Sequence, residues 1–210
     1  VFIEKPITST LDEASELVQL AKKNNLVGQV GHVERFNSAF SNIKYKLNPK
    51  FIESHRLSSY PQRGTDVSVV LDLMIHDIDI VLSIVNSRVK KISANGTKIV
   101  STSPDISNAR IEFENGCVAN LTASRLSLKK MRKMRIFQSD SYISIDFDSG
   151  VSEHIRIKDY DKKNKYAMTI KDSEGNIKEI EINNFENKKV NSIQEEHLDF
   201  YNSILNKQSP

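Results

Sequence analysis

A lysine stands where a short apolar segment of the chain ends. Val1-Phe2-Ile3 has the composition of a strand buried inside a parallel sheet, and Glu4-Lys5-Pro6 follows it directly. Ligands of open α/β sheets bind beyond the carboxyl ends of the strands, and Pro6 fixes the direction in which Lys5 leaves its strand. A partly desolvated lysine there has a lowered pKa and can take part in proton transfer. The alternative is a surface lysine beside a turn.

A carboxylate and an imidazole are spaced four residues apart in the longest helix that the sequence predicts, Ser68 to Val85. This spacing places Asp72 and His76 on adjacent turns. A carboxylate there would orient the imidazole and raise its basicity, as a general base requires. Two other interpretations stay open: the pair only stabilises the helix, or it supplies two ligands of a metal site.

A third polar cluster follows an apolar strand. The segment Gly31 to Asn37, with the sequence GHVERFN, has no apolar periodicity. Its Arg35 has a guanidinium that can contact a phosphate or a carboxylate through two hydrogen bonds. The alternative is a segment that crosses between two domains and whose polar groups bond only to the backbone.

The elements that position Lys5 form the order strand, helix, strand. Thr10 and Glu13 have the spacing of a capping box, and a helical face of apolar residues follows them. Leu26 to Val33 is again apolar and typical of a strand. This order predicts the βαβ unit of a parallel sheet.

The rest of the chain predicts an α+β architecture. We expect a short helix from about Ser38 to Leu47, a strand over Phe51 to Leu57 and a loop over Ser59 to Val67. Strands only follow the long helix, until a final amphipathic helix that Ser192 caps. These strands are expected at Val89 to Ile99, Ala109 to Phe113, Cys117 to Ser124, Lys133 to Phe137, Tyr142 to Phe147, His154 to Ile157, Tyr166 to Ile170 and Ile177 to Ile182.

One hairpin in this set can be predicted in detail. Apolar residues alternate up to Phe113 and again from Cys117. A two-residue Asn-Gly turn would place the two apolar sets on opposite faces, whereas a three-residue loop, Glu114-Asn115-Gly116, aligns them. We therefore predict a bulged hairpin with Gly116 in the left-handed region, in a mostly antiparallel sheet.

The composition, 38% hydrophobic and 27% charged, is typical of a soluble globular protein. No apolar run approaches the ~20 residues that span a bilayer. The single cysteine, Cys117, excludes an internal disulfide framework and favours a reducing, cytoplasmic location. The net charge of +3, without an interleaved aromatic platform, argues against a nucleic-acid partner.

Together these motifs resemble the Gfo/Idh/MocA family of NAD(P)-dependent oxidoreductases. The resemblance is carried by Glu4-Lys5-Pro6, by the junction from Gly31-His32 to Arg35-Phe36-Asn37, by the segment from Asp72 through His76 to Asp79, and by the Glu114-Asn115-Gly116 hairpin. It implies a Rossmann domain, then a domain with a large, open, mostly antiparallel sheet that carries helices on one face. It also implies NAD or NADP as cofactor, and hydride transfer between nicotinamide and a secondary hydroxyl of a sugar or polyol.

The same resemblance implies roles for individual residues. Lys5 and His76 would handle the proton of the reacting hydroxyl, and Asp72 would orient them. The cofactor would contact Glu4, Lys5, Pro6 and Arg35, and the Lys5–Pro6 peptide bond is often cis in the family. We expect the substrate to contact His32, Glu34, Asn37, Arg63 and Asp79. No metal is expected.

The resemblance also divides the chain. Residues 1–36 would be the last βαβ unit of a dinucleotide-binding domain, and residues 37–210 a substrate-binding and oligomerisation domain. The glycine-rich G-x-G-x-x-G loop does not occur in the sequence. We therefore expect the chain to lack most of its Rossmann domain, so that the whole protein is the enzyme and this part alone is inactive.

The GHVERFN junction is similar to that of family members that oxidise UDP-activated amino sugars. A diphosphate needs cations, which Arg56, Arg63, Arg125 and the basic run from Lys129 to Arg135 could supply. The alternative for that run is a solvated basic strand, whose alternation divides the charges between two faces.

The open face of the large sheet predicts a partner. An uncovered apolar sheet face is usually covered by another subunit, so we expect a homodimer or homotetramer through this face. Two other function classes stay open at this point: a non-catalytic binding or oligomerisation module of the same fold, and a metalloenzyme. Loss of Lys5 would disable the dehydrogenase but not the binding module.

Overall fold

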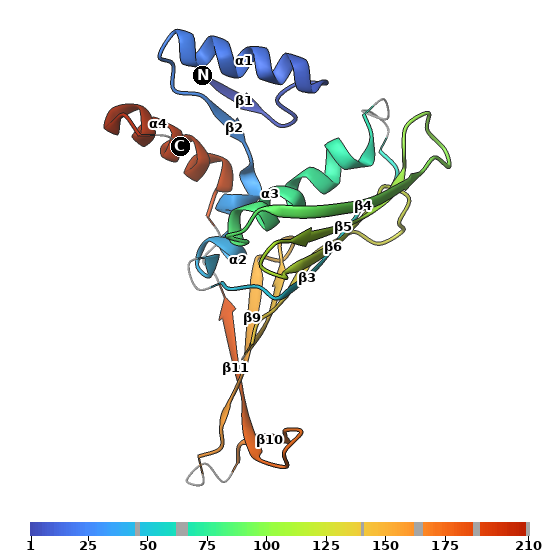
Figure 1. Ribbon diagram of the computed structural model, residues 1–210, viewed down its shortest axis with the longest axis vertical. Helices are drawn as coiled ribbons and strands as arrows, with labels where there is room; N and C mark the ends of the chain where they lie inside the picture. Colours follow the sequence, from blue (N-terminus) through green and yellow to red (C-terminus); the bar gives the residue numbers. More distant parts are fainter. Residues whose placement is uncertain (45–46, 62–66, 140, 162–165, 187–189, 209–210) are drawn as a thin grey trace.

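A computed structural model describes residues 1–44, 47–61, 67–139, 141–161, 166–186 and 190–208 of the chain (Figure 1). The first elements form a two-stranded parallel sheet, in which β1 (Phe2–Glu4) pairs with β2 (Gln29–Gly31). The helix α1 (Leu11–Lys23) connects the two strands. The predicted βαβ order is therefore confirmed, although the second strand is shorter than the apolar run that predicted it.

The start of α1 is fixed by the capping box that the sequence predicts. The side chain of Thr10 accepts a hydrogen bond from the backbone N–H of Glu13, and the Glu13 carboxylate accepts one from the backbone N–H of Thr10. Acidic residues in the first turn and lysines in the last turn complement the helix dipole.

The remaining strands form one large sheet of nine strands in the order β10-β11-β9-β8-β7-β3-β6-β5-β4. All neighbours pair antiparallel except β3 and β6, which run parallel. The strands span β3 (Phe51–Leu57), β4 (Val89–Thr97), β5 (Ile106–Phe113), β6 (Val118–Ser124), β7 (Met131–Phe137), β8 (Ser141–Asp146), β9 (Val151–Asp159), β10 (Met168–Lys171) and β11 (Ile177–Glu186). The large, mostly antiparallel sheet is confirmed.

The predicted hairpin between β5 and β6 is also confirmed. The backbone N–H of Phe113 donates to the carbonyl of Cys117, so that three residues form the loop. Gly116 has a φ of +84°, in the left-handed region. The apolar side chains of the two strands consequently share the buried face of the sheet.

The long predicted helix is divided into two kinds of turn. A π-helical segment, η3 (Val70–Met74), precedes the α-helix α3 (Ile75–Ile84). The helix predicted from Ser38 to Leu47 was too long: α2 covers only Ser38–Ser41, because the Ile43 N–H then bonds to the Phe40 carbonyl, three residues back. The short 3-10 helix η1 (Val33–Phe36) precedes α2. Within the described ranges, no helix combines the length and apolarity that a membrane span requires.

The core lies between one face of the large sheet and the helices α2 and α3. Ile52 on β3, Ala119 on β6 and Ile136 on β7 are buried there, together with Phe40 of α2 and Ile80 of α3. Side chains along β3 alternate between buried and half-buried, which is the pattern of a strand with one covered face. All described helices lie on the same side of this sheet (Figure 1).

The C-terminal helix α4 (Ser192–Asn206) returns to the N-terminal strands (Figure 1). The Phe2 ring of β1 packs against His197 at 4.9 Å and against Phe200 at 5.7 Å between ring centroids. The N-cap is Asn191, not the predicted Ser192, because the Asn191 side chain accepts from the Gln194 N–H.

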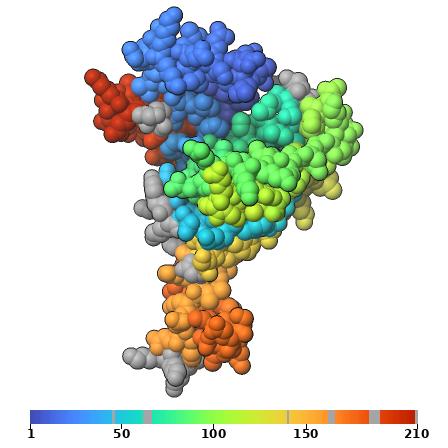
Figure 2. Space-filling model, in the orientation of Figure 1, coloured from blue at the N-terminus to red at the C-terminus, as the bar shows by residue number. Residues whose placement is uncertain are grey.

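The strands β10, β11 and the end of β9 extend beyond the body of the molecule. We call this part the arm, and Figure 2 shows it as a narrow projection in orange. Its pairing is regular, with Met168 opposite Ile180 and Ile180 opposite Ile157. Several apolar side chains of the arm are exposed: Ile157, Met168, Ile170, Ile177 and Ile182.

Candidate active site

Lys5 lies directly after β1, at the carboxyl end of the parallel strand pair. Its Nζ donates a hydrogen bond to the backbone carbonyl of Asp72 at 2.6 Å and lies 3.7 Å from Asp72 Oδ1. Burial lowers the pKa of Lys5; the Asp72 carboxylate opposes this shift and the charge of Arg56 adds to it. Lys5 therefore loses its proton more readily than a surface lysine does, which suits a group that exchanges a proton.

The strand end that carries Lys5 is closely packed. Glu4 is the register partner of Gly31, and a Cβ on Gly31 would lie 2.8 Å from the Glu4 Oε2. Glycine at this position therefore permits the Glu4 carboxylate to lie against the β2 backbone. The Lys5–Pro6 peptide bond is cis, as the family resemblance implies.

His76 lies in the first turn of α3, and its Nδ1 is buried without a hydrogen-bond partner among the described residues. Burial, followed by the positive charges of Arg56, Lys5, His32 and Arg132, lowers the pKa of His76 to about 3. The prediction that a carboxylate raises the basicity of this imidazole is wrong. His76 is neutral at physiological pH and can donate or accept a hydrogen bond without charge.

The predicted pair of Asp72 and His76 does not form within the part of the chain that the structure describes. The Ile75 N–H bonds to the Val70 carbonyl five residues back, as in a π-helix. The two residues therefore lie in turns of different kinds, Asp72 in the π-helical segment and His76 in the α-helix. Asp72 contacts Lys5 instead.

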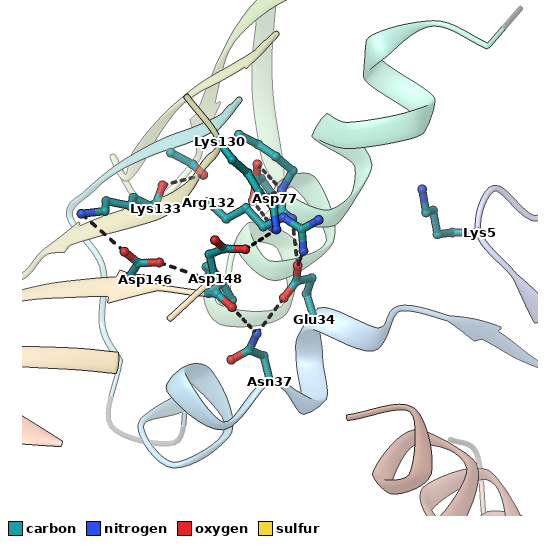
Figure 3. A network of polar contacts seen from close by, with 12 residues as sticks. Lys5, Glu34, Asn37, Asp77, Lys130, Arg132, Lys133, Asp146 and Asp148 are labelled. Carbon is teal, nitrogen blue, oxygen red and sulfur yellow. Dashed lines mark hydrogen bonds and ion pairs between the residues drawn. The ribbon is translucent and has the colours of Figure 1, made fainter. Parts of the chain in front are cut away.

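A buried cluster of charges lies beneath His76. The guanidinium of Arg56 donates to the Asp77 carboxylate at 2.9 Å from Nη2, and to Glu34 Oε1 at 2.8 Å from Nη1. Arg132 lies 3.6 Å from the same Glu34 oxygen and is half-exposed. Figure 3 shows this network, with Lys5 to one side of it. The charges of the two buried carboxylates are therefore compensated by the buried Arg56 and the half-exposed Arg132.

Two predicted substrate residues, Glu34 and Asn37, form hydrogen bonds with other residues of the chain. Glu34 is buried against Arg56, and Asn37 Nδ2 donates both to Glu34 Oε2 at 3.1 Å and to the Phe147 carbonyl at 3.0 Å. Asn37 Oδ1 also caps α2 through the Ala39 N–H. The geometry gives both side chains a positioning role, and their contact with substrate stays a prediction.

The other predicted junction residues meet at Asp79 of α3. Arg35 donates two hydrogen bonds to the Asp79 carboxylate, at 2.7 and 2.6 Å, and His32 Nε2 lies 3.7 Å from its Oδ1. These residues line a cavity of about 320 Å³ together with Glu196 of α4. The Arg35 guanidinium is thus paired with the Asp79 carboxylate. Its contact with the cofactor stays a prediction. Arg63 lies outside the described residues.

The basic run divides between two faces of β7, as its alternation predicts. Lys133 and Arg135 pair with Asp146 and Glu53, and these side chains are exposed or half-buried. Arg132 reaches the opposite face, where Glu34 lies. Two other cations considered for a diphosphate, Arg56 and Arg125, are buried in ion pairs, whereas Arg132 is half-exposed and its charge acts on the pKa of His76.

The structure brings Lys5 and His76 into one neighbourhood. Lys5 binds the backbone of the helix that carries His76, and its charge acts on the pKa of His76 and His32. Sequence reasoning missed Asp77 and the partners of Arg56. An acidic residue in the middle of an apolar helix, next to His76, was the signal that could have found Asp77.

A buried acid in α4 was also missed. Glu196 is fully buried, and neither of its carboxylate oxygens has a hydrogen-bond partner within the described part of the chain. Burial, with the charges of Glu4, Asp79 and Asp199, raises the pKa of Glu196 to about 7; the backbone of His32 opposes the rise without meeting the geometry of a hydrogen bond. No described group of three or more His, Cys, Asp or Glu side chains is arranged to hold a metal.

Comparison with known sequences matches two family models. The Gfo/Idh/MocA C-terminal domain matches residues 18–155, and the oxidoreductase family with an NAD-binding Rossmann fold matches residues 1–32. A UDP-N-acetylglucosamine 3-dehydrogenase from Acidithiobacillus ferrooxidans is 37% identical over 147 residues, which cover 69% of this chain and 47% of that protein. An uncharacterized oxidoreductase, YrbE, from Bacillus subtilis is 28% identical over 182 residues, which cover 79% of this chain and 53% of its own length.

Comparison of structures gives a similar result. The solved UDP-N-acetylglucosamine 3-dehydrogenase from Acidithiobacillus ferrooxidans superposes with a TM-score of 0.85 at 30% identity, over 99% of this chain and 63% of that one. The chain spans about half the length of the curated relatives it matches.

Proposed function

Because the chain belongs to the Gfo/Idh/MocA family of NAD-binding oxidoreductases, we propose that the whole protein transfers a hydride between nicotinamide and a secondary hydroxyl of a sugar or nucleotide-sugar. The observation that carries the proposal is the environment of the Lys5 amine. Its amine has a lowered pKa, lies beyond the carboxyl end of a parallel strand pair, and is bound to the helix that bears His76.

The strand end fits the nicotinamide half of a dinucleotide. Such cofactors bind beyond the carboxyl ends of parallel strands, which is where Glu4 and Lys5 lie. Glu4, Lys5 and Pro6 would hold this end of the cofactor. When bound, NAD supplies the hydride acceptor, and the protein supplies placement and electrostatics.

The chain's own residues then handle one proton. In the oxidation direction, the neutral Lys5 amine accepts the hydroxyl proton as the carbon loses its hydride and becomes a ketone. The His76 imidazole does not take up a second ring proton at neutral pH, so it orients the hydroxyl oxygen through an uncharged hydrogen bond. Asp72 holds the Lys5 side chain in place through its backbone carbonyl.

Replacement of Lys5 tests this function in the whole protein. We expect Lys5→Ala to reduce NAD reduction by about a hundred-fold or more, because a positioned proton acceptor is lost. Lys91→Ala, on the exposed strand β4, is the matched control and keeps full activity. Equal turnover in wild type and Lys5→Ala would refute the catalytic assignment and favour a binding module.

The finer proposal is a UDP-activated amino sugar as substrate. It is supported by the relative at 37% identity and by Arg132, whose half-exposed guanidinium is available to a diphosphate. We expect turnover of UDP-N-acetylglucosamine, with NAD or NADP, and none of free N-acetylglucosamine at equal concentration. Equal turnover of both sugars would remove the diphosphate from the proposal.

We also propose that the whole protein is a homodimer or homotetramer through the open face of the large sheet. One apolar row crosses six strands on that face, with each member opposite the next in register: Val118, Phe51, Phe137, Tyr142, Ile155 and Ile182. A cytoplasmic location follows from the single cysteine as an expectation.

A further inference from the structure

Arg56 is an arginine in the interior of the central strand β3, and its side chain is 3% exposed. Its planar guanidinium contacts two carboxylates at once. The Nε and Nη2 groups donate to Asp77 at 3.1 and 2.9 Å, while Nη1 donates to Glu34 at 2.8 Å. The guanidinium also lies 5.8 Å from the centre of the Phe147 ring. Its donors are therefore divided between two acceptors that come from different elements.

These two acceptors belong to the segments that form the candidate site. Glu34 lies in η1, directly after β2, which is the register partner of the strand that carries Lys5. Asp77 follows His76 in the first turn of α3. The guanidinium thus connects the junction after the strand pair to the helix that bears the imidazole.

We propose that Arg56 is a positioning residue for the candidate active site, which it serves by fixing the helix of His76 to the junction that follows the strands of Lys5. The inference rests on the proposed function for its role in catalysis. Arg56 itself touches neither substrate nor cofactor in this assignment, because its side chain is 3% exposed and its hydrogen-bond donors are taken up by Asp77 and Glu34.

The contact with two carboxylates at once favours arginine over lysine at position 56. A guanidinium presents a rigid fork that can bond two carboxylates in fixed directions, whereas an ammonium is a single point of charge. Arg56→Lys keeps the positive charge but cannot hold both acceptors in the same geometry. The charge itself is also placed to act on His76, where it opposes protonation of the imidazole.

Arg125 provides a matched control for this test. Its side chain is fully buried like that of Arg56, and its Nε donates to the Asp105 carboxylate at 2.8 Å. Its other donors bond the Val67 carbonyl and the Ser103 hydroxyl. Arg125 is not among the charges that lower the pKa of His76, so the two arginines share burial but differ in the group they face.

The experiment compares Arg56→Lys with Arg125→Lys in the whole protein. We expect both variants to lower the melting temperature, but only Arg56→Lys to lower kcat by about tenfold or more, with the KM for cofactor changed less than twofold. Glu34→Gln is the second variant, for the case that Arg56→Lys does not fold. It keeps Arg56 and Asp77 in place but weakens the contacts of Glu34 with Arg56 and with Arg132, and it is expected to lower kcat in the same way.

A second readout does not depend on activity. In histidine-labelled protein, the NMR signals of the His76 ring should move in Arg56→Lys and Glu34→Gln and stay in place in Arg125→Lys. This readout separates the inference from the proposed function: if no substrate turns over, the NMR comparison still decides. Unmoved His76 signals in Arg56→Lys, or equal loss of kcat in Arg125→Lys, would overturn the positioning role.

Discussion

Two ionisable residues of the candidate site have lowered pKa values, and burial is the largest cause for both. Burial lowers the pKa of both Lys5 and His76, and the positive charge of Arg56 adds to both shifts. The consequence is a division of roles. His76, with a pKa of about 3, serves as an uncharged hydrogen-bond partner, and Lys5 is the group that can change its charge.

The buried acid Glu196 makes a separate prediction at this scale. Its pKa rises from 4.5 to about 7 in the native state, so the native chain binds more protons than the unfolded chain in this window. Stability should therefore fall as the pH rises from about 4.5 to about 7. Glu196→Gln should remove this slope and raise the free energy of unfolding at pH 8 by on the order of 3 kcal/mol at most.

Chemical denaturation of the whole protein at several pH values measures the effect. The groups that face Glu196 are Glu4 of β1, the backbone of His32, Asp79 of α3 and Asp199 of α4 itself. Glu195→Gln, at the exposed preceding position, is the matched control and keeps the slope. A slope that survives in Glu196→Gln would assign the pH dependence to another group.

At the scale of single elements, local chemistry predicted the features that depend on neighbours in sequence. The capping box of Thr10 and Glu13 and the three-residue loop at Gly116 are both confirmed, because each is a contact within four residues. The π-turn before Ile75 could not be predicted, since the same apolar spacing fits an α-helix.

The site was predictable only in part, because some of its contacts join residues that are far apart in sequence. Lys5 follows a strand, and strand ends are visible in a sequence. The partners of Arg56 are set by the placement of η1 and α3 against β3, which brings together segments far apart in the chain. The periodicity that placed Asp72 beside His76 assumed an unbroken α-helix, whereas Asp72 lies in the π-helical segment and contacts Lys5.

The hairpin loop makes a prediction for stability. Gly116 has a φ of +84°, so a side chain there is strained, and Gly116→Ala should cost about 1 kcal/mol of unfolding free energy. Gly28→Ala is the control: no atom lies within 4 Å of a Cβ at Gly28, and its φ lies outside the left-handed region. Thermal denaturation compares the two, and equal melting temperatures would contradict the prediction.

At the scale of the whole molecule, α4 alters the division into two units that the sequence predicts. The boundary near residue 36 stays a prediction, but the helix at the other end of the chain packs against Phe2 of the first strand. The arm extends in the opposite direction from these elements (Figure 1). The open sheet face and the arm therefore remain available to a second copy of the chain.

The apolar row on that face predicts how self-association can be broken. Ile182 belongs to the row and is 49% exposed, whereas Ile177, at 48%, lies on the opposite face of the same strand. Ile182→Lys should shift the whole protein to smaller oligomers in sedimentation velocity, because a charge is costly in a buried interface. Ile177→Lys should leave the oligomer unchanged. Dissociation by both variants, or by neither, would remove the interface from this row.

The position of β3 in the middle of the large sheet has a consequence for how the chain is made. Its neighbours β6 and β7 both follow it in the sequence, with the long helix in between. At a synthesis rate of about 5–20 residues per second, the ribosome needs roughly 3 to 13 s to pass from the end of β3 to the end of β6. Until then Ile52, which is buried in the folded chain, lies on an unpaired strand of the nascent chain. We therefore expect chaperones to bind the chain mainly during this interval.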